Sequence, residues 1–228
     1  MVRWRGREGS RNVEDARGQG PVSAGLAGLL IRLVLSRFGL GGIAVLAAGF
    51  VGLSLVGVNP MALLSGGAAG GGKISAQDEE IGDFVSVILR ETEIVWGDIF
   101  SAAGADYREP ALRMFSGAEQ SACGYATAAV GPFYCPADRK VYLDTEFFDE
   151  LSRRFGASGD FAAAYVIAHE VGHHVQTLTG VADKVRDAQQ GASEAEANAL
   201  QTRMELQADC YAGVWANRAG SARGLLEE

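Results

Sequence analysis

The five residues from His169 to His173 read His-Glu-Val-Gly-His, and they constrain this chain more than any other feature. All three histidines of the protein, His169, His173 and His174, lie in or next to this stretch. On a helix, positions i and i+4 share a face, so His169 and His173 can point at one atom, and neutral imidazole is a good zinc ligand. Glu170 lies one step round the same helix, where it can act as a general base on a metal-activated water. The pattern therefore predicts a zinc site.

The surrounding sequence predicts a helix over residues 161–178, with Asp160 as its N-cap. Apolar residues recur at helical spacing on the side opposite the two histidines: Ile167, Val171, Val175 and Leu178. Gly172 costs a helix about 1 kcal/mol relative to alanine, a cost that is tolerated where something must approach the backbone closely. Two histidines on a helix can also be ordinary core or surface residues, so the prediction depends on a further ligand from elsewhere.

The distribution of charge suggests how the chain is divided. Its 228 residues are 48% hydrophobic and carry a formal net charge of −8, which allows one domain with appendages and argues against nucleic-acid binding. The first 37 residues hold seven arginines against three acids. We predict that residues 1–37 are a cationic cytoplasmic tail, disordered over about the first 21 residues.

A membrane anchor is expected after this tail. Residues 38–58 contain no charged side chain and are long enough for a transmembrane helix. Positive charge stays in the cytoplasm, so Arg32 and Arg37 predict a single-pass protein of the cell membrane, with the N-terminus inside and the rest extracytoplasmic. A buried soluble helix and a cleaved signal peptide are the alternatives. Residues 59–77 are glycine-rich and are expected to be a flexible linker.

Residues 78–228 are predicted to form an α+β domain. Apolar spacing predicts its first helix over residues 78–102. Short strands separated by turn residues suggest a small antiparallel sheet, and they fall at residues 112–115, 125–130 and 140–143.

The three cysteines bear on the compartment of this domain. Cys123 and Cys135 bracket the middle strand, and outside the cytoplasm they can form a disulfide that contributes roughly 2–4 kcal/mol. Two free thiols are the alternative. Cys210 is left over and is expected to be a buried thiol.

A catalytic zinc needs three protein ligands, and with no fourth histidine the third must be a carboxylate or a thiolate. Residues 193–217 predict a long helix with one polar stripe, made of Asn198, Thr202, Glu205 and Asp209. A solvated face is the ordinary explanation, but the sequence around the last two is largely apolar, and carboxylates in such a run require a partner. We predict that Glu205 is the third ligand and that Asp209 accepts the free ring N–H of a zinc-bound histidine.

Several stretches together resemble the bacterial family of putative neutral zinc metallopeptidases, which is gluzincin-like in having HExxH followed by Glu-x-x-x-Asp. They are Cys-Gly at 123–124, Gly-Pro-Phe-Tyr-Cys-Pro at 131–136, Tyr-Leu-Asp at 142–144, His-Glu-Val-Gly-His-His-Val-Gln at 169–176 and Glu-Leu-Gln-Ala-Asp-Cys at 205–210. The resemblance implies a zincin-like fold, zinc ligands His169, His173 and Glu205, catalytic Glu170 and an N-terminal membrane helix. Members usually continue beyond the helix that carries Glu205, so the domain is expected to be C-terminally shortened.

Together these features predict a membrane-anchored zinc peptidase that acts on peptide or protein substrates, with Glu170 taking a proton from the attacking water. A strand edge in the 125–134 region is expected to hold an extended peptide. Tyr165 and Gln176 share the ligand face of the first helix and are candidates for supporting roles. Two other functions stay open: an inactive zinc-binding module in a membrane complex or oligomer, and a deformylase-like hydrolase with Cys135 or Cys210 as ligand.

Overall fold

The computed structural model describes residues 2–17, 74–127, 131–148, 151 and 159–226. Residues 1–16 and 74–228 form one compact unit, and residues 17–73 form a second. The expected anchor at residues 38–58 lies outside the described residues. Among the residues that are described, no helix is both long and apolar enough to cross a membrane.

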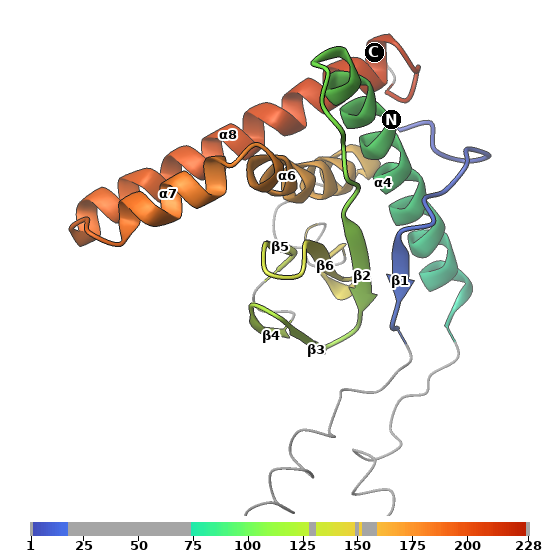
Figure 1. Cartoon of the computed structure of the whole chain (residues 1–228). Helices are drawn as coiled ribbons and strands as arrows, with labels where there is room; N and C mark the ends of the chain where they lie inside the picture. Colours follow the sequence, from blue (N-terminus) through green and yellow to red (C-terminus); the bar gives the residue numbers. More distant parts are fainter. Residues whose placement is uncertain (1, 18–73, 128–130, 149–150, 152–158, 227–228) are drawn as a thin grey trace, which may run out of the picture. The chain divides into compact units, whose positions relative to one another are not determined.

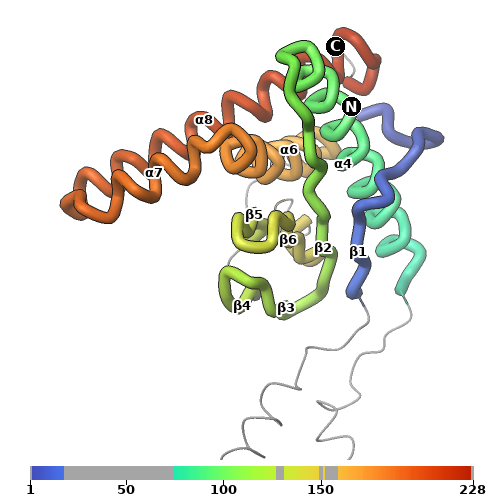
Figure 2. The backbone as a smooth tube through the Cα atoms, viewed as in Figure 1, coloured from blue at the N-terminus to red at the C-terminus, as the bar shows by residue number. Residues whose placement is uncertain are grey.

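Four helices are defined in the described part of the chain: α4 (Ala76–Ala102), α6 (Asp160–Leu178), α7 (Val181–Gln189) and α8 (Glu194–Ser221). Three of them confirm the helices predicted from apolar spacing, and α7 packs along the first half of α8 (Figure 2). Serine capping boxes begin two of them, with Ser75 before α4 and Ser193 before α8. The N-cap of α6 is Gly159 and not Asp160, which instead stands in the first turn.

The sheet is mixed, and this corrects the expected antiparallel sheet. Its strand order is β1 (Val13–Asp15), β2 (Ala111–Phe115), β6 (Lys140–Asp144) and β5 (Phe133–Cys135). The first three strands run parallel, and only β5 is antiparallel to its neighbour. The chain between β2 and β6 makes a separate antiparallel hairpin of β3 (Ala118–Ser121) and β4 (Gly124–Thr127) and then β5, so it returns to β6 in the original direction (Figure 1).

The core lies between this sheet and the helices α4, α6 and α8. The predicted apolar stripe of α6 faces it, because Ile167, Val171 and Val175 are buried, while Leu178 at the end of the helix is half-buried. Strands β2 and β6 contribute Leu112 and Val141, and α8 contributes the fully buried Trp215. The opposite side of α6 is thereby left for His169 and His173.

Residues 2–16 are part of this unit, whereas the sequence analysis expected a disordered tail. Val2 and Trp4 are buried, Val2 pairs with Leu226, and β1 adds a parallel strand to β2 (Figure 1). The Trp4 indole N–H also donates to the Asp160 carboxylate over 3.2 Å. A polar, arginine-rich segment is ordered here because it completes a sheet and a core built by residues far along the chain.

The arginines of this segment have acidic partners. Arg7 donates to the buried Glu91 of α4 over 2.8 Å, and Arg223 contacts the same carboxylate. On the sheet, Glu14 accepts from Lys140 over 2.7 Å. These contacts pack residues 2–16 and the helical domain into one unit.

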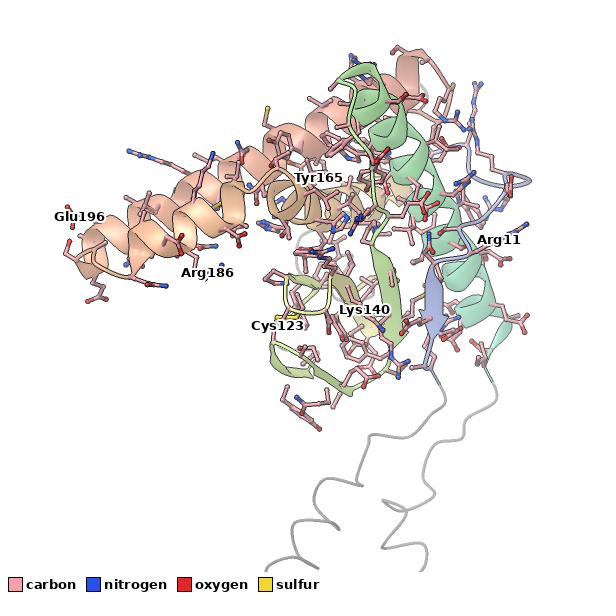
Figure 3. The ribbon with its side chains drawn as sticks, viewed as in Figure 1. Arg11, Cys123, Lys140, Tyr165, Arg186 and Glu196 are labelled. Carbon is pink, nitrogen blue, oxygen red and sulfur yellow. A yellow bond between two sulfur atoms is a disulfide. The ribbon has the colours of Figure 1, made fainter. Side chains whose placement is uncertain are left out.

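Cys123 and Cys135 form a disulfide with a Cα–Cα distance of 5.7 Å, as predicted (Figure 3). It joins the β3–β4 turn to the last residue of β5. Cys210 is exposed and not buried, because it lies on the outer face of α8 while Ala208 and Ala212 face the core.

Helices α6 and α8 come into close contact at Gly172. A β-carbon placed there would lie 3.0 Å from the carbonyl oxygen of Ala208 and 3.2 Å from its α-carbon. The neighbour is backbone and not a flexible side chain, so it has little room to give. Gly172, the glycine predicted to allow a close approach, is therefore the point where α6 and α8 come into contact.

We expect Gly172→Ala to lower the free energy of unfolding by roughly 1–3 kcal/mol, because the added methyl group overpacks this contact. The matched control is Gly213→Ala in α8, where a β-carbon meets nothing within 4 Å. That change should stabilise the helix by about 0.5–1 kcal/mol. Denaturant unfolding of the three proteins measures both effects, and equal responses at the two positions would contradict the assigned contact.

A second stability prediction concerns Glu91. Burial raises the pKa of the Glu91 carboxyl, but hydrogen bonds and charges from Arg223 and Arg7 outweigh it, so the pKa lies below its ordinary value. A lowered pKa stabilises the fold above the ordinary glutamate range, and this contribution is lost as the pH falls through the folded-state value. Glu91→Gln should therefore cost roughly 1.5–3 kcal/mol at neutral pH, with a smaller difference from wild type in acid.

The control for Glu91 is Arg5→Gln, because the Arg5–Glu80 pair is exposed, with side chains 72% and 53% accessible. It should leave the midpoint of urea unfolding unchanged. If Glu91→Gln were as harmless as Arg5→Gln at pH 7, residues 2–16 would not be held in the way described.

Candidate metal centre

Helix α6 presents His169 and His173 on the side away from the core. The residues are one helical turn apart, and their ring centroids lie 4.8 Å from each other. Their side chains are 18% and 17% exposed, so the pair borders solvent without being a free surface. The i, i+4 arrangement predicted from the sequence is thus present.

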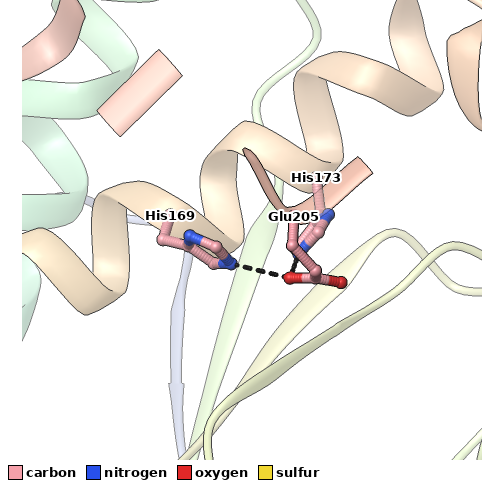
Figure 4. Close-up of side chains that lie close together, drawn as sticks. All are labelled: His169, His173 and Glu205. Atoms are coloured by element: carbon pink, nitrogen blue, oxygen red, sulfur yellow. Dashed lines mark hydrogen bonds and ion pairs between the residues drawn. The ribbon is translucent and has the colours of Figure 1, made fainter. Parts of the chain in front are cut away.

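Glu205 reaches the two rings from α8. Its Oε2 lies 3.2 Å from Nε2 of His169 and 3.3 Å from Nε2 of His173, and Figure 4 shows the carboxylate between them. The other oxygen, Oε1, accepts from the Gln201 side chain over 2.7 Å. His169 and Glu205 are 36 positions apart in the sequence, yet all three groups converge on one point.

The spacing of these three groups fits zinc. Ligands about 2.0–2.1 Å from a tetrahedral zinc ion stand roughly 3.3 Å from one another, which is the separation of Glu205 from each ring nitrogen. All three donor atoms lie within 4.8 Å of one another. Within the described residues, this is the cluster of histidine, cysteine and acidic side chains close enough to hold a metal ion. Two imidazoles and one carboxylate are also a common donor set of catalytic zinc sites.

Asp209 lies one turn beyond Glu205 and contacts the back of the first ring. Its Oδ1 is 2.9 Å from Nδ1 of His169 and also accepts from the Tyr165 hydroxyl over 2.8 Å. The hydrogen bond from Tyr165, with a further one from His169, holds the pKa of the Asp209 carboxyl below its ordinary value. An ionised carboxylate can only accept, so the shorter contact with Asp209 favours a proton on Nδ1 of His169, and Nε2, 3.2 Å from Glu205, is the nitrogen left to bind a metal between them.

The second ring is contacted by an amide. Nδ1 of His173 lies 2.9 Å from Oε1 of Gln176, a fully buried side chain one turn further along α6. Tyr165 and Gln176 were both expected on the ligand face. Tyr165 contacts Asp209 and Gln176 contacts His173, and neither stands at the point where the three candidate ligands converge.

Glu170 is buried beside the ligands, with 7% of its surface exposed. Burial, and then the negative charge of Glu205, raise the pKa of its carboxyl to about 8, although a hydrogen bond from the backbone N–H of Tyr134 works in the opposite direction. A carboxyl group with a pKa near neutrality can both accept and return a proton at physiological pH. The contact with Tyr134 was not predicted, since β5 has only three residues and no alternating pattern.

His174 faces the core and takes no part in the cluster. Its Nε2 donates to the Arg108 carbonyl oxygen over 2.6 Å, so its Nδ1 is the acceptor for the Tyr134 hydroxyl at 3.0 Å. Burial lowers the pKa of this fully enclosed imidazole, which keeps it neutral. His174 thus orients Tyr134, the residue whose backbone contacts Glu170.

The remaining candidates lie away from the cluster. Of the polar stripe on α8, Asn198 and Thr202 are exposed, and the Thr202 hydroxyl donates to the backbone carbonyl of Asn198, which is the solvated face expected by default. The thiolate alternative loses Cys135 to the disulfide, and Cys210 is not in the converging group. Among the residues described, the third ligand position is therefore a carboxylate.

Comparison with known proteins finds similar chains in bacteria. The chain is 46% identical over 239 residues to the protein YpfJ of Escherichia coli (strain K12), an alignment that covers 99% of this chain and 78% of the relative. It is 52% identical over 118 residues to the protein Rv2575 of Mycobacterium tuberculosis (strain H37Rv), covering 51% of this chain and 39% of the relative. Both relatives carry the description "uncharacterized protein", so neither supplies an activity. No solved structure is detectably similar to this chain.

The family comparison is broader than either relative. The sequence profile described as "Putative neutral zinc metallopeptidase" matches residues 2–228. The match includes the N-terminal segment that packs on α4 as well as both helices of the cluster. The chain therefore belongs to the family of putative neutral zinc metallopeptidases.

Proposed function

We propose that this protein is a zinc-dependent peptidase that hydrolyses peptide bonds at the site formed by His169, His173 and Glu205. One observation carries the proposal: two ring nitrogens and a carboxylate oxygen, 3.2 and 3.3 Å apart, converge beside the buried acid Glu170. A structural zinc site usually has a fourth protein ligand, and it has no use for an adjacent acid with a raised pKa. This site has three candidate ligands and such an acid.

The chain supplies proton transfer and orientation. Zinc bound at this position would polarise the scissile carbonyl and bring the pKa of water towards about 7. Glu170 takes a proton from the attacking water, holds it at its carboxyl group and delivers it to the leaving nitrogen. Asp209 keeps the ring of His169 in the tautomer that faces the site with a lone pair.

We further propose that the substrate is an extended peptide lying along β5. This strand is at one end of the sheet and lies against α6, next to Glu170. An edge strand offers backbone groups to an added strand, which favours peptide substrates over small molecules. This proposal assigns the strand edge expected in the 125–134 region to β5, Phe133–Cys135, which overlaps the end of that region.

We expect Glu170→Gln to retain stoichiometric zinc but to lose at least about 100-fold in peptide hydrolysis, because the amide cannot take the proton. Hydrolysis of a peptide library by the purified full-length chain, together with its zinc content, measures both. Glu205→Ala should lose zinc and activity together.

The matched control is Arg186→Gln on α7, where the Arg186–Asp183 pair is 61% exposed on both sides. It should leave zinc and hydrolysis unchanged. Hydrolysis by Glu170→Gln at the wild-type rate would contradict the proposed role of Glu170 in proton transfer. Zinc bound by a wild-type chain that cleaves no peptide would favour the inactive module instead.

We also propose that the metal domain works outside the cytoplasm, and that the apolar stretch at residues 38–58 attaches it to the cell membrane without a single complete crossing, in place of the single-pass anchor expected from the sequence. The disulfide between Cys123 and Cys135 supports an oxidising compartment. Residues 2–16 pack within the same unit, which supports placing the N-terminal segment in that compartment too.

Cysteine labelling tests this placement. Arg11 and Arg186 are exposed on the N-terminal segment and on α7 (Figure 3). In a Cys210→Ser background, we expect Arg11→Cys and Arg186→Cys to react equally with a membrane-impermeant maleimide in intact cells. Labelling at position 186 alone, with position 11 reacting only after lysis, would show that the segment and the domain lie in different compartments.

A further inference from the structure

The amide of Gln176 is the least exposed polar group around the metal centre. Gln176 is 0% exposed, yet each of its polar atoms has a partner. Its Nε2 lies 2.8 Å from the carbonyl oxygen of Met204 and 3.0 Å from Oε1 of Gln207, both on α8. Its Oε1 lies 2.9 Å from Nδ1 of His173 on its own helix. Two ligand helices and one candidate ligand therefore meet at a single side chain.

The partners of this amide determine its orientation. A backbone carbonyl can only accept, so the atom facing Met204 must be the amide nitrogen. The atom facing His173 must then be the amide oxygen, which is an acceptor. It follows that Nδ1 of His173 carries a ring proton and that Nε2, 3.3 Å from Oε2 of Glu205, is the nitrogen positioned to bind a metal.

We propose that Gln176 is a positioning residue that sets the tautomer and the ring orientation of His173 for metal binding. The inference deepens the proposed function and relies on the same site. His169 is oriented by the carboxylate of Asp209, whereas His173 is oriented by a neutral amide. A neutral acceptor does this without adding a further negative charge next to Glu205 and Glu170.

The same amide also fixes the distance between the ligand helices. Met204, whose carbonyl accepts from Gln176, directly precedes Glu205 in α8. The hydrogen bond therefore ties the backbone that carries the third ligand to the side chain that orients the second. A purely structural helix contact would not need an acceptor aimed at the ring nitrogen of His173.

The histidine rings provide a direct test, because the chain has only three histidines. In the full-length, metal-free protein labelled with 15N-histidine, at a pH that keeps the rings neutral, NMR should show His169 and His173 protonated at Nδ1. His174 should be protonated at Nε2, because that atom donates to the Arg108 carbonyl.

Gln176→Met keeps the shape of the side chain and removes both kinds of hydrogen bond. We expect His173 alone to lose its Nδ1–H preference and the zinc affinity, measured by chelator competition, to fall about 10- to 100-fold. The control is Gln207→Ala, which removes one helix contact of Gln176 but leaves the bond to His173. It should leave the His173 spectrum unchanged and the zinc affinity within about twofold.

The proposal is overturned if wild-type His173 is protonated at Nε2, an outcome that does not depend on the variant folding. It is also overturned if Gln176→Met leaves both the ring spectrum and the zinc affinity unchanged. A wild-type chain that binds no zinc would instead contradict the proposed function, because the tautomer is read without metal or substrate.

Discussion

The close approach of α6 and α8 at Gly172 is the contact on which the rest of the site depends. Ala208 lies against Gly172 with no room for a β-carbon between them. Glu205 and Asp209 stand three residues before and one residue after this point, so both reach the histidines of the facing helix. A wider helix pair would move the carboxylates away from the rings, because side chains in staggered rotamers have a limited reach. The glycine thus contributes through geometry and not through any chemistry of its own.

Around this contact, each histidine has a hydrogen-bond partner that fixes the orientation of its ring. Asp209 and Gln176 each accept from an Nδ1 atom, so both Nε2 atoms of the pair face Glu205. His174, which follows His173 in the sequence and points toward the core, has the reverse tautomer and orients Tyr134. The adjacent histidines His173 and His174 therefore have different roles, because one side of α6 faces Glu205 and the other faces the core.

The sequence predicted what depends on local spacing. The motif at residues 169–173, the helices at α4, α6 and α8, and the stripe that places Asp209 one turn from Glu205 follow from the 3.6-residue period alone. Features that depend on distant partners were missed. The arginine-rich start looked disordered because Glu91, the partner of Arg7, lies 84 residues away. Three-residue strands such as β1 and β5 carry too few residues to show a period, so neither the parallel order nor the role of Tyr134 was visible.

The disulfide links the compartment of the protein to the geometry of its site. Cys135 is the last residue of β5, and its bond to Cys123 fixes that short edge strand to the β3–β4 turn. The neighbouring residue, Tyr134, donates its backbone N–H to Glu170, so the position of the strand influences the proton affinity of the acid. A strand of three residues has few hydrogen bonds of its own, and reduction of the bond would leave it held mainly by β6 and His174. An oxidising environment therefore favours both an ordered β5 and a fixed Glu170.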